Sequence, residues 1–134
     1  MPSLLYRCLK SPRLWQLALA CYWLALFIGT HVPIDRIPLQ QKSADKVAHL
    51  AAFAGLAMIF ATTWQLSAGR LMVRHLVWAW VVIALYGAVE EMTQPPVGRV
   101  ASFWDWLADA SGAALGLLAF VLIRRVVEGR PRTI

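Results

Sequence analysis

The chain has 134 residues, of which 60% are hydrophobic, and a formal net charge of +6. A soluble domain of this size would need far more polar surface, so the composition excludes that class and indicates an integral membrane protein. The positive charge does not indicate nucleic-acid binding, because Lys and Arg residues beside membrane spans orient those spans and no basic stripe lies on a soluble face.

Three apolar segments are long enough to cross a bilayer, which takes about 20 residues, and a fourth is nearly so. We expect spans at about residues 14–32, 47–66, 71–93 and 103–127. The first span follows a basic segment, as in a signal peptide, but its apolar run lacks a small-residue cleavage site, so we expect it to be retained. The sequence therefore predicts an all-α fold: one membrane domain over residues 1–134, built as a four-helix bundle.

The distribution of Lys and Arg predicts the orientation of this bundle. Four spans place both termini on one side, and nine Lys and Arg residues fall on that side against four on the other. The positive-inside rule then predicts cytoplasmic termini and two outward-facing loops. We expect a multi-pass protein of the cytoplasmic membrane, with the lipid bilayer as its first partner.

Polar residues gather at the outward ends of the second, third and fourth spans. The candidate ligand-binding residues are Asp45, Lys46, His49, Glu90, Glu91, Gln94, Arg99, Ser102, Asp105 and Asp109. Ionisable residues within a membrane are costly, and for that reason they mark a functional site by default. We therefore predict an acidic pocket with Arg and His side chains on the outward face.

Glu90 and Glu91 are adjacent, so in a helix they point about 100° apart and cannot both face one partner. If one of them faces His49, Lys46 or Arg99, the other is left to face the headgroup region. A charged and unpaired glutamate is costly in this apolar neighbourhood, so we expect either a cationic partner or a raised pKa. Arg99 suits a bidentate contact with a carboxylate or a phosphate, either within the chain or from a ligand.

Several of these residues also have an ordinary local explanation. Ser102 is expected to cap the fourth helix, and Asp45 and Asp105 are favoured in the first turn of a helix. Lys46 is able simply to extend towards lipid headgroups. His49 suits proton transfer, metal binding or a hydrogen bond, but one histidine with carboxylates is a weak metal signal, so we predict no metal site and no cofactor.

Asp109 lies one turn deeper than Asp105 on the same face of the fourth span. The small residues near this face are Ala108, Gly112 and Gly116. A small-xxx-small pattern lets a neighbouring helix approach closely, either within the chain or in a homo-oligomer. We expect the fourth helix to pack inward along this face, with Asp109 serving either structure or function.

The outer cluster resembles the VanZ-like family, small membrane proteins named for one that is associated with resistance to the glycopeptide teicoplanin. That family has Asp-Lys-x-x-His at the start of an apolar helix, as Asp45-Lys46-Val47-Ala48-His49 does here. The counterparts of its second block are Glu90-Glu91, Gln94, Gly98-Arg99, Ser102, Asp105, Asp109, Gly112 and Gly116. The resemblance covers about residues 45–120.

The chain departs from the family at three points. The family commonly has Asp-Glu where this chain has Glu90-Glu91, and it has Asn where this chain has Asp109. The proline that usually lies beside Gly-Arg is shifted to Pro95-Pro96. The additional carboxylate makes this cluster more acidic than that of the family.

The resemblance implies a protein of the cell envelope and leaves three functions open. The first is an outward-facing pocket that binds a lipid headgroup or a cell-wall-related ligand and affects teicoplanin susceptibility. The second is an enzyme acting on a lipid-linked phosphate or ester, with His49 or a glutamate as general base and Lys46 and Arg99 holding the phosphate. The third is a structural charge network that only joins the helices.

Overall fold

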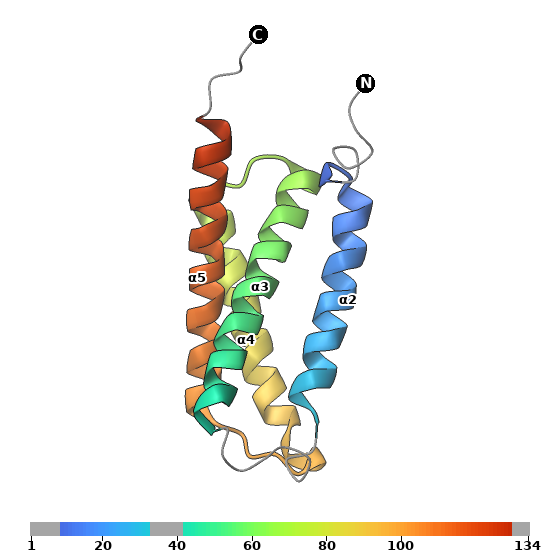
Figure 1. The fold of residues 1–134 in the computed structure, drawn as a ribbon, viewed down its shortest axis with the longest axis vertical. Coiled ribbons are helices and arrows are strands. Elements are labelled where there is room, and N and C mark those ends of the chain that lie inside the picture. Colours follow the sequence, from blue (N-terminus) through green and yellow to red (C-terminus); the bar gives the residue numbers. More distant parts are fainter. Residues whose placement is uncertain (1–8, 33–41, 130–134) are drawn as a thin grey trace.

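The structure, a computed structural model, describes residues 9–32 and 42–129, and the regular structure in these two segments is entirely helical. Its main elements are α2 (Pro12–Thr30), α3 (Lys42–Ala68), α4 (Val73–Thr93), η3 (Pro95–Val97) and α5 (Phe103–Glu128). The four α-helices run side by side along the long axis (Figure 1) and are long and apolar enough to cross a membrane. The all-helical prediction and the four candidate spans are confirmed.

Two helix starts differ from the predicted boundaries. α3 begins at Lys42 rather than near residue 47, so the polar residues before position 47 form its first turn. Asp45 lies in this turn, where the helix dipole stabilises a carboxylate. α2 begins at Pro12, because proline suits the first turn, where no backbone N–H donor is needed. As a consequence, the residues from Asp45 to His49 lie on a rigid helix.

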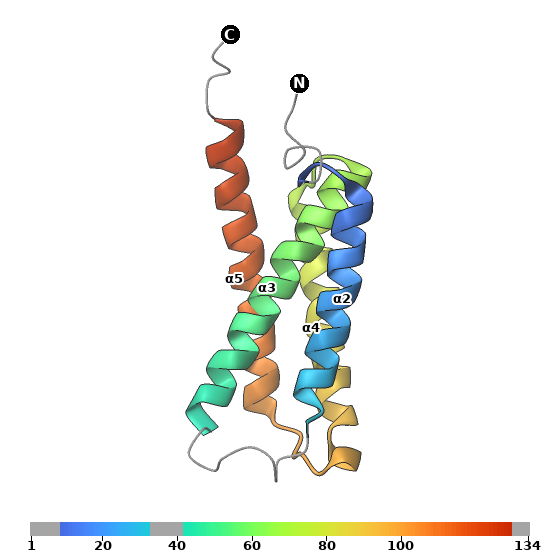
Figure 2. The ribbon, with the colours of Figure 1, turned by 45° about the vertical axis from the view of Figure 1, so that its right-hand side comes forward.

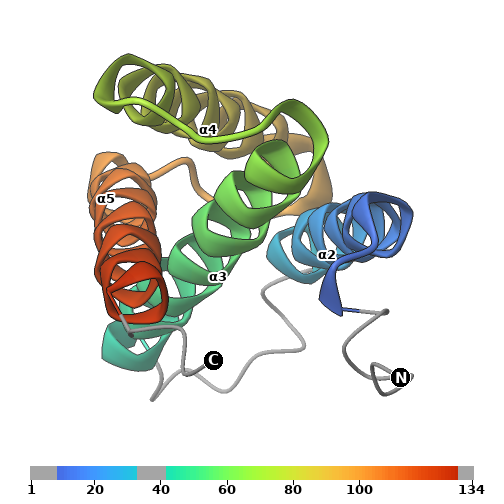
Figure 3. The same cartoon turned by 90° about the horizontal axis from the view of Figure 1, so that it is seen from above.

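α3 and α5 form the most extensive helix contact, and α3 also lies between α2 and α5 when the bundle is seen from above (Figure 3). The two helices cross along their length (Figure 2). A Cβ atom on Gly112 would overlap the carbonyl oxygen of Leu50, and one on Gly116 would overlap that of Ala54. Gly112 and Gly116 of the predicted small-residue stripe therefore contact α3 within the chain.

α4 is joined to α5 by two tryptophans that reach across in opposite directions. The indole N–H of Trp80 donates to the carbonyl oxygen of Ala110 at 2.9 Å, and that of Trp106 donates to Ala84 at 2.9 Å. Each bond satisfies a polar group that lipid could not satisfy. These bonds fix the height of α4 against α5 and hence the relative positions of their polar residues.

The connection from α4 to α5 folds back tightly through η3. Gly98, with a φ of 79°, ends η3 in the left-handed region that glycine adopts at no steric cost. Ser102 then caps α5 by accepting a hydrogen bond from the backbone N–H of Asp105 at 3.3 Å, as predicted. The end of α4 and the start of α5 are thereby held next to the end of α2 and the start of α3 (Figure 1).

Candidate functional site

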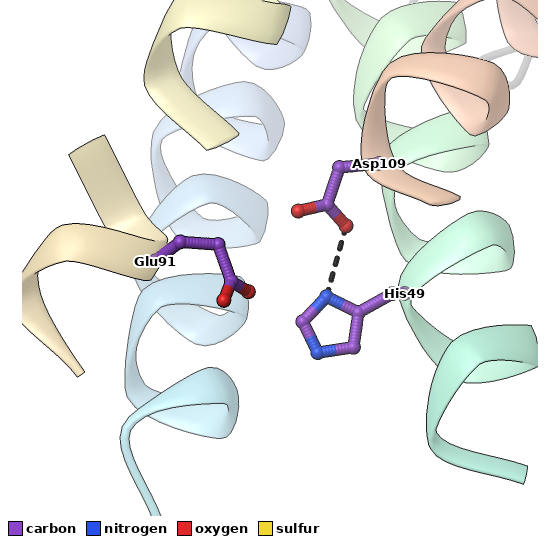
Figure 4. A group of neighbouring side chains, drawn as sticks. All are labelled: His49, Glu91 and Asp109. Atoms are coloured by element: carbon purple, nitrogen blue, oxygen red, sulfur yellow. Dashed lines mark hydrogen bonds and ion pairs between the residues drawn. The ribbon is translucent and has the colours of Figure 1, made fainter. Parts of the chain in front are cut away.

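Three helices each contribute one buried side chain to the centre of the polar end of the bundle. His49 comes from α3, Glu91 from α4 and Asp109 from α5 (Figure 4). Their exposed fractions are 5%, 5% and 0%. His49 Nδ1 lies 2.9 Å from Asp109 Oδ1, and one ligand atom from each residue falls within 4.8 Å of the other two. These three residues are called the inner cluster below.

Glu91 is held in place by the turn that follows α4. Its Oε2 accepts a hydrogen bond from the backbone N–H of Ser102 at 2.6 Å, and its Oε1 accepts one from the Gln94 side chain at 3.2 Å. Gln94 is itself 2% exposed. The carboxylate is therefore fixed by short-range contacts and presented towards His49 (Figure 4).

Glu90 points to a different helix. Its Oε1 accepts hydrogen bonds from the hydroxyls of Thr30 at 2.6 Å and Tyr86 at 2.9 Å. Glu90 is 1% exposed, so the expectation that one of the two glutamates faces the headgroup region is wrong. α2 covers Glu90 and removes it from the surface. The prediction that the two glutamates take separate partners is confirmed.

The remaining charges form two ion pairs nearer the surface. Arg99 Nη2 lies 3.2 Å from Asp45 Oδ2, with side-chain exposures of 6% and 37% respectively. Lys46 Nζ lies 2.7 Å from Asp105 Oδ1, with exposures of 49% and 14%. Both pairs join α3 to the segment that follows α4. Arg99 and Lys46 thus each have a carboxylate partner inside the chain.

A pocket of about 320 Å³ opens between α2 and α3 beside these residues. Its lining residues are Ala25, Leu26, Gly29, Thr30, Asp45, Ala48, His49, Ala52, Phe53 and Arg99. The deeper positions along both helices are apolar, whereas the polar members lie near the helix ends. The pocket is therefore amphipathic, with Asp45, His49 and Arg99 at its polar end.

The structure brings all ten predicted residues to one end of the bundle, although they fall into separate groups. Asp35 and Arg36, which the sequence also places at this end, lie outside the described residues. Thr30 and Tyr86 were missed: both donate to Glu90 and one lines the pocket. Tyr86 precedes Glu90 by one helical turn and was recognisable in principle, but Thr30 comes from a distant helix and carried no local signal.

Carboxylates outnumber cations in the interior of this end. Glu90, Glu91 and Asp109 are buried, and within the described segments neither glutamate lies within ion-pair distance of a cationic side chain. Asp109 Oδ2 and Glu90 Oε2 also have no hydrogen-bond partner among the described residues. Buried polar atoms normally have a hydrogen-bond partner, so these two oxygens are unusual and call for an explanation.

Compared with protein-family models, curated proteins and solved structures, the chain shows no match.

Proposed function

We propose that this protein is a multi-pass protein of the cytoplasmic membrane that binds a phosphate-bearing headgroup in the pocket between α2 and α3. Its outward helix faces support membrane insertion, because large apolar side chains such as Leu17, Leu85 and Leu118 are more than half exposed along the bundle. The surplus of Lys and Arg at the end that carries both termini supports a cytoplasmic location for that end. The polar end then faces outward.

The observation that carries the ligand proposal is the amphipathic pocket with a buried arginine at its polar end. A guanidinium has five N–H donors in a planar fork, so Arg99 retains donors for a phosphate while one nitrogen contacts Asp45. The apolar walls suit the first methylenes of an attached lipid chain. At about 320 Å³ the pocket lies at the small end of the range for ligand sites, which fits a headgroup rather than a whole lipid.

The resemblance to the VanZ-like family adds a physiological proposal. A pocket that holds a headgroup or a cell-wall-related ligand at the outer surface would alter the surface at which teicoplanin acts. This follows from the resemblance over residues 45–120, whose Asp-Lys-x-x-His and Gly-Arg segments meet in the Asp45–Arg99 ion pair. Teicoplanin susceptibility is therefore a second measurement, besides ligand binding, of what these residues do.

Ligand binding is tested directly with purified full-length protein in detergent. We expect tryptophan fluorescence to report saturable binding of a short-chain phospholipid, and weaker binding of the diacylglycerol that lacks the phosphate. Arg99→Ala removes a charge-assisted hydrogen bond worth roughly 1.5–3 kcal/mol, so the dissociation constant should rise about tenfold or more. Arg125→Ala, an exposed arginine near the other end of the bundle, is the matched control. Equal binding of both lipids, or unchanged binding by Arg99→Ala, would refute the proposal.

The cellular test measures teicoplanin susceptibility in a sensitive Gram-positive host, with membrane levels of each variant quantified. Protection by the wild type that is lost in Arg99→Ala and Asp105→Asn at normal protein level would support the envelope role. Orientation is tested separately with a membrane-impermeant maleimide, which should label Val100→Cys but not Ser67→Cys in intact cells. The reverse labelling would place the polar end in the cytoplasm.

A second candidate, an enzyme acting on a lipid-linked phosphate or ester, is favoured by one observation. His49 lines the pocket and is paired with the buried Asp109 at 2.9 Å, an arrangement in which a carboxylate orients an imidazole as general base. Turnover of a lipid-linked substrate by the purified protein, abolished in His49→Ala, would support this activity. Binding of the same substrate without turnover would leave the headgroup-binding function.

A further inference from the structure

We infer that the inner cluster, formed by His49, Glu91 and Asp109, is a binding site for a divalent transition-metal cation, contrary to the expectation from the sequence that the chain has no metal site. Its three side chains come from α3, α4 and α5, so an ion there would tie the three helices together at the polar end (Figure 4). The inference stands apart from the proposed headgroup binding, because the pocket ligand is held at Arg99 and the cation within the cluster, and it is an alternative to the second candidate, in which His49 and Asp109 serve proton transfer.

The chemistry of the donor set selects the class of cation. One imidazole nitrogen and two carboxylates form a mixed N/O set of the kind that binds Zn²⁺, Mn²⁺ or Fe²⁺. The only cysteine in the described residues, Cys21, lies on α2 with its side chain exposed, and it contributes no sulfur ligand that would select a softer ion. Three protein ligands leave at least one coordination position open, which is typical of metal sites that also bind water or a substrate.

The distances are close to those of a formed site. Ligand atoms around one ion, each about 2.0–2.2 Å from it, lie roughly 3–4 Å from one another. The inner cluster already has its histidine and aspartate atoms 2.9 Å apart, and all three ligand atoms lie within 4.8 Å. A shift of roughly 1 Å in the longer glutamate side chain would bring the third ligand into range.

An independent observation points into the cluster. Asp109 is 0% exposed, and its Oδ2 has no hydrogen-bond partner among the described residues. This oxygen is directed towards the side of the cluster from which Glu91 approaches (Figure 4). A buried carboxylate oxygen without a donor is rare in proteins, and an ion bound between the two carboxylates would satisfy it.

The charge balance supports the same conclusion. The interior holds three carboxylates, of Glu90, Glu91 and Asp109, and one imidazole, while Lys46 and Arg99 are paired with other carboxylates. Burying excess negative charge without compensation is costly, and a divalent cation compensates it directly. Nearby contacts also resemble the outer support of a metal site, since Glu91 is fixed by the Gln94 amide and the Ser102 backbone.

The surroundings of the cluster allow an ion to enter. His49 lines the pocket of about 320 Å³, so one ligand of the cluster is reachable from that space. A Cβ atom on Gly87 of α4 would come within 3.3 Å of Asp109 Oδ2. Glycine at this position therefore leaves room for the carboxylate oxygen that has no hydrogen-bond partner among the described residues.

The test measures metal binding by the full-length protein in detergent after removal of bound metal with a chelator. Zn²⁺ is measured by mass spectrometry, and Co²⁺ is used as a visible spectroscopic probe that Zn²⁺ displaces. We expect close to one ion per chain, and a thermal unfolding midpoint that rises on addition of Zn²⁺ and falls again with chelator, because an ion bound to the folded state stabilises it. The isosteric variants Asp109→Asn and Glu91→Gln should lose the Co²⁺ spectrum and the stabilisation.

Two further variants make the result specific. Gln94→Ala, which removes an outer contact of Glu91, should weaken Zn²⁺ binding roughly 10–100-fold without abolishing it. His75→Ala removes a histidine of α4 at the other end of the bundle and should leave binding unchanged. The inference is overturned if the folded wild type binds no ion, or if Asp109→Asn and Glu91→Gln bind it as the wild type does. Loss of binding in His75→Ala would also overturn it, because the ion would then depend on a histidine outside the inner cluster.

Discussion

The glycines of α5 offer the sharpest test of how this bundle holds its site, because the contact at Gly112 adjoins the His49–Asp109 pair. A Cβ atom on Gly112 would lie 2.9 Å from the carbonyl carbon of Leu50 and still closer to its oxygen. Leu50 is the residue after His49, and Gly112 is one turn beyond Asp109. A methyl group here cannot be accommodated by a side-chain rotation, since the obstacle is backbone.

The cost of Gly112→Ala follows from two opposing terms. Overpacking of this kind costs about 1–3 kcal/mol. Alanine recovers about 1 kcal/mol of helix propensity relative to glycine. The matched control is Gly29→Ala on α2, where a Cβ atom would meet nothing within 4 Å and only the propensity term applies. The difference in unfolding free energy between the two alanine variants should therefore be about 1–3 kcal/mol, with Gly112→Ala the less stable.

The same substitution should damage the site. Separating the backbones to ordinary van der Waals distance takes roughly 1 Å, which would stretch the 2.9 Å His49–Asp109 contact beyond hydrogen-bonding range. Unfolding in mixed detergent micelles, followed by tryptophan fluorescence, measures the stability. Histidine side-chain NMR reports the loss of the hydrogen bond. If Gly112→Ala is at least as stable as Gly29→Ala and keeps the His49 signal, the close approach of α3 and α5 is not what positions the pair.

Four further substitutions separate buried from exposed interactions. Tyr86→Phe removes one of the two hydroxyls that donate to Glu90 and should lower the unfolding free energy by roughly 1.5–3 kcal/mol in the same micelle assay. Trp106→Phe loses an interhelical hydrogen bond and should cost about 1 kcal/mol, whereas Trp104→Phe, at an exposed indole, should be neutral by thermal unfolding. Lys46→Gln breaks an ion pair whose lysine is half exposed, so it should lower the unfolding free energy by no more than about 1 kcal/mol. A larger loss would contradict the exposed position of this ion pair.

The features that the sequence predicts well are those set by neighbouring residues. Long apolar runs specify the four helices, and the serine at position 102 specifies the cap of α5 because its hydroxyl needs only the backbone of Asp105. The small-residue stripe on α5 also predicts close packing, since Gly112 and Gly116 leave the helix backbone uncovered on one face. The sequence does not indicate whether the stripe contacts another helix of the same chain or a second copy. In the structure Gly112 and Gly116 pack against α3.

The features that escape the sequence depend on how distant helices are placed against one another. His49 and Asp109 are 60 residues apart, and a shift of α3 by one turn would separate them by about 5 Å. The burial of Glu90 likewise depends on α2, which brings Thr30 to within 2.6 Å of the carboxylate. No periodicity in either segment encodes such a contact. This is why the sequence predicts the members of the polar end but not their division into an inner cluster, a glutamate bound by hydroxyls and two outer ion pairs.

This division allows a functional site to be distinguished by experiment from a merely structural charge network. If the charges only join the helices, every substitution should lower protein level and function together. In the Lys46–Asp105 pair the lysine is half exposed, so neutralising Lys46 should cost little stability, whereas Asp45→Asn would leave the buried Arg99 without its carboxylate partner. The buried Asp109 has no such freedom, because removing its charge leaves His49 without its partner. Lys46→Gln is therefore the variant in which a loss of headgroup binding at normal protein level would show function apart from folding.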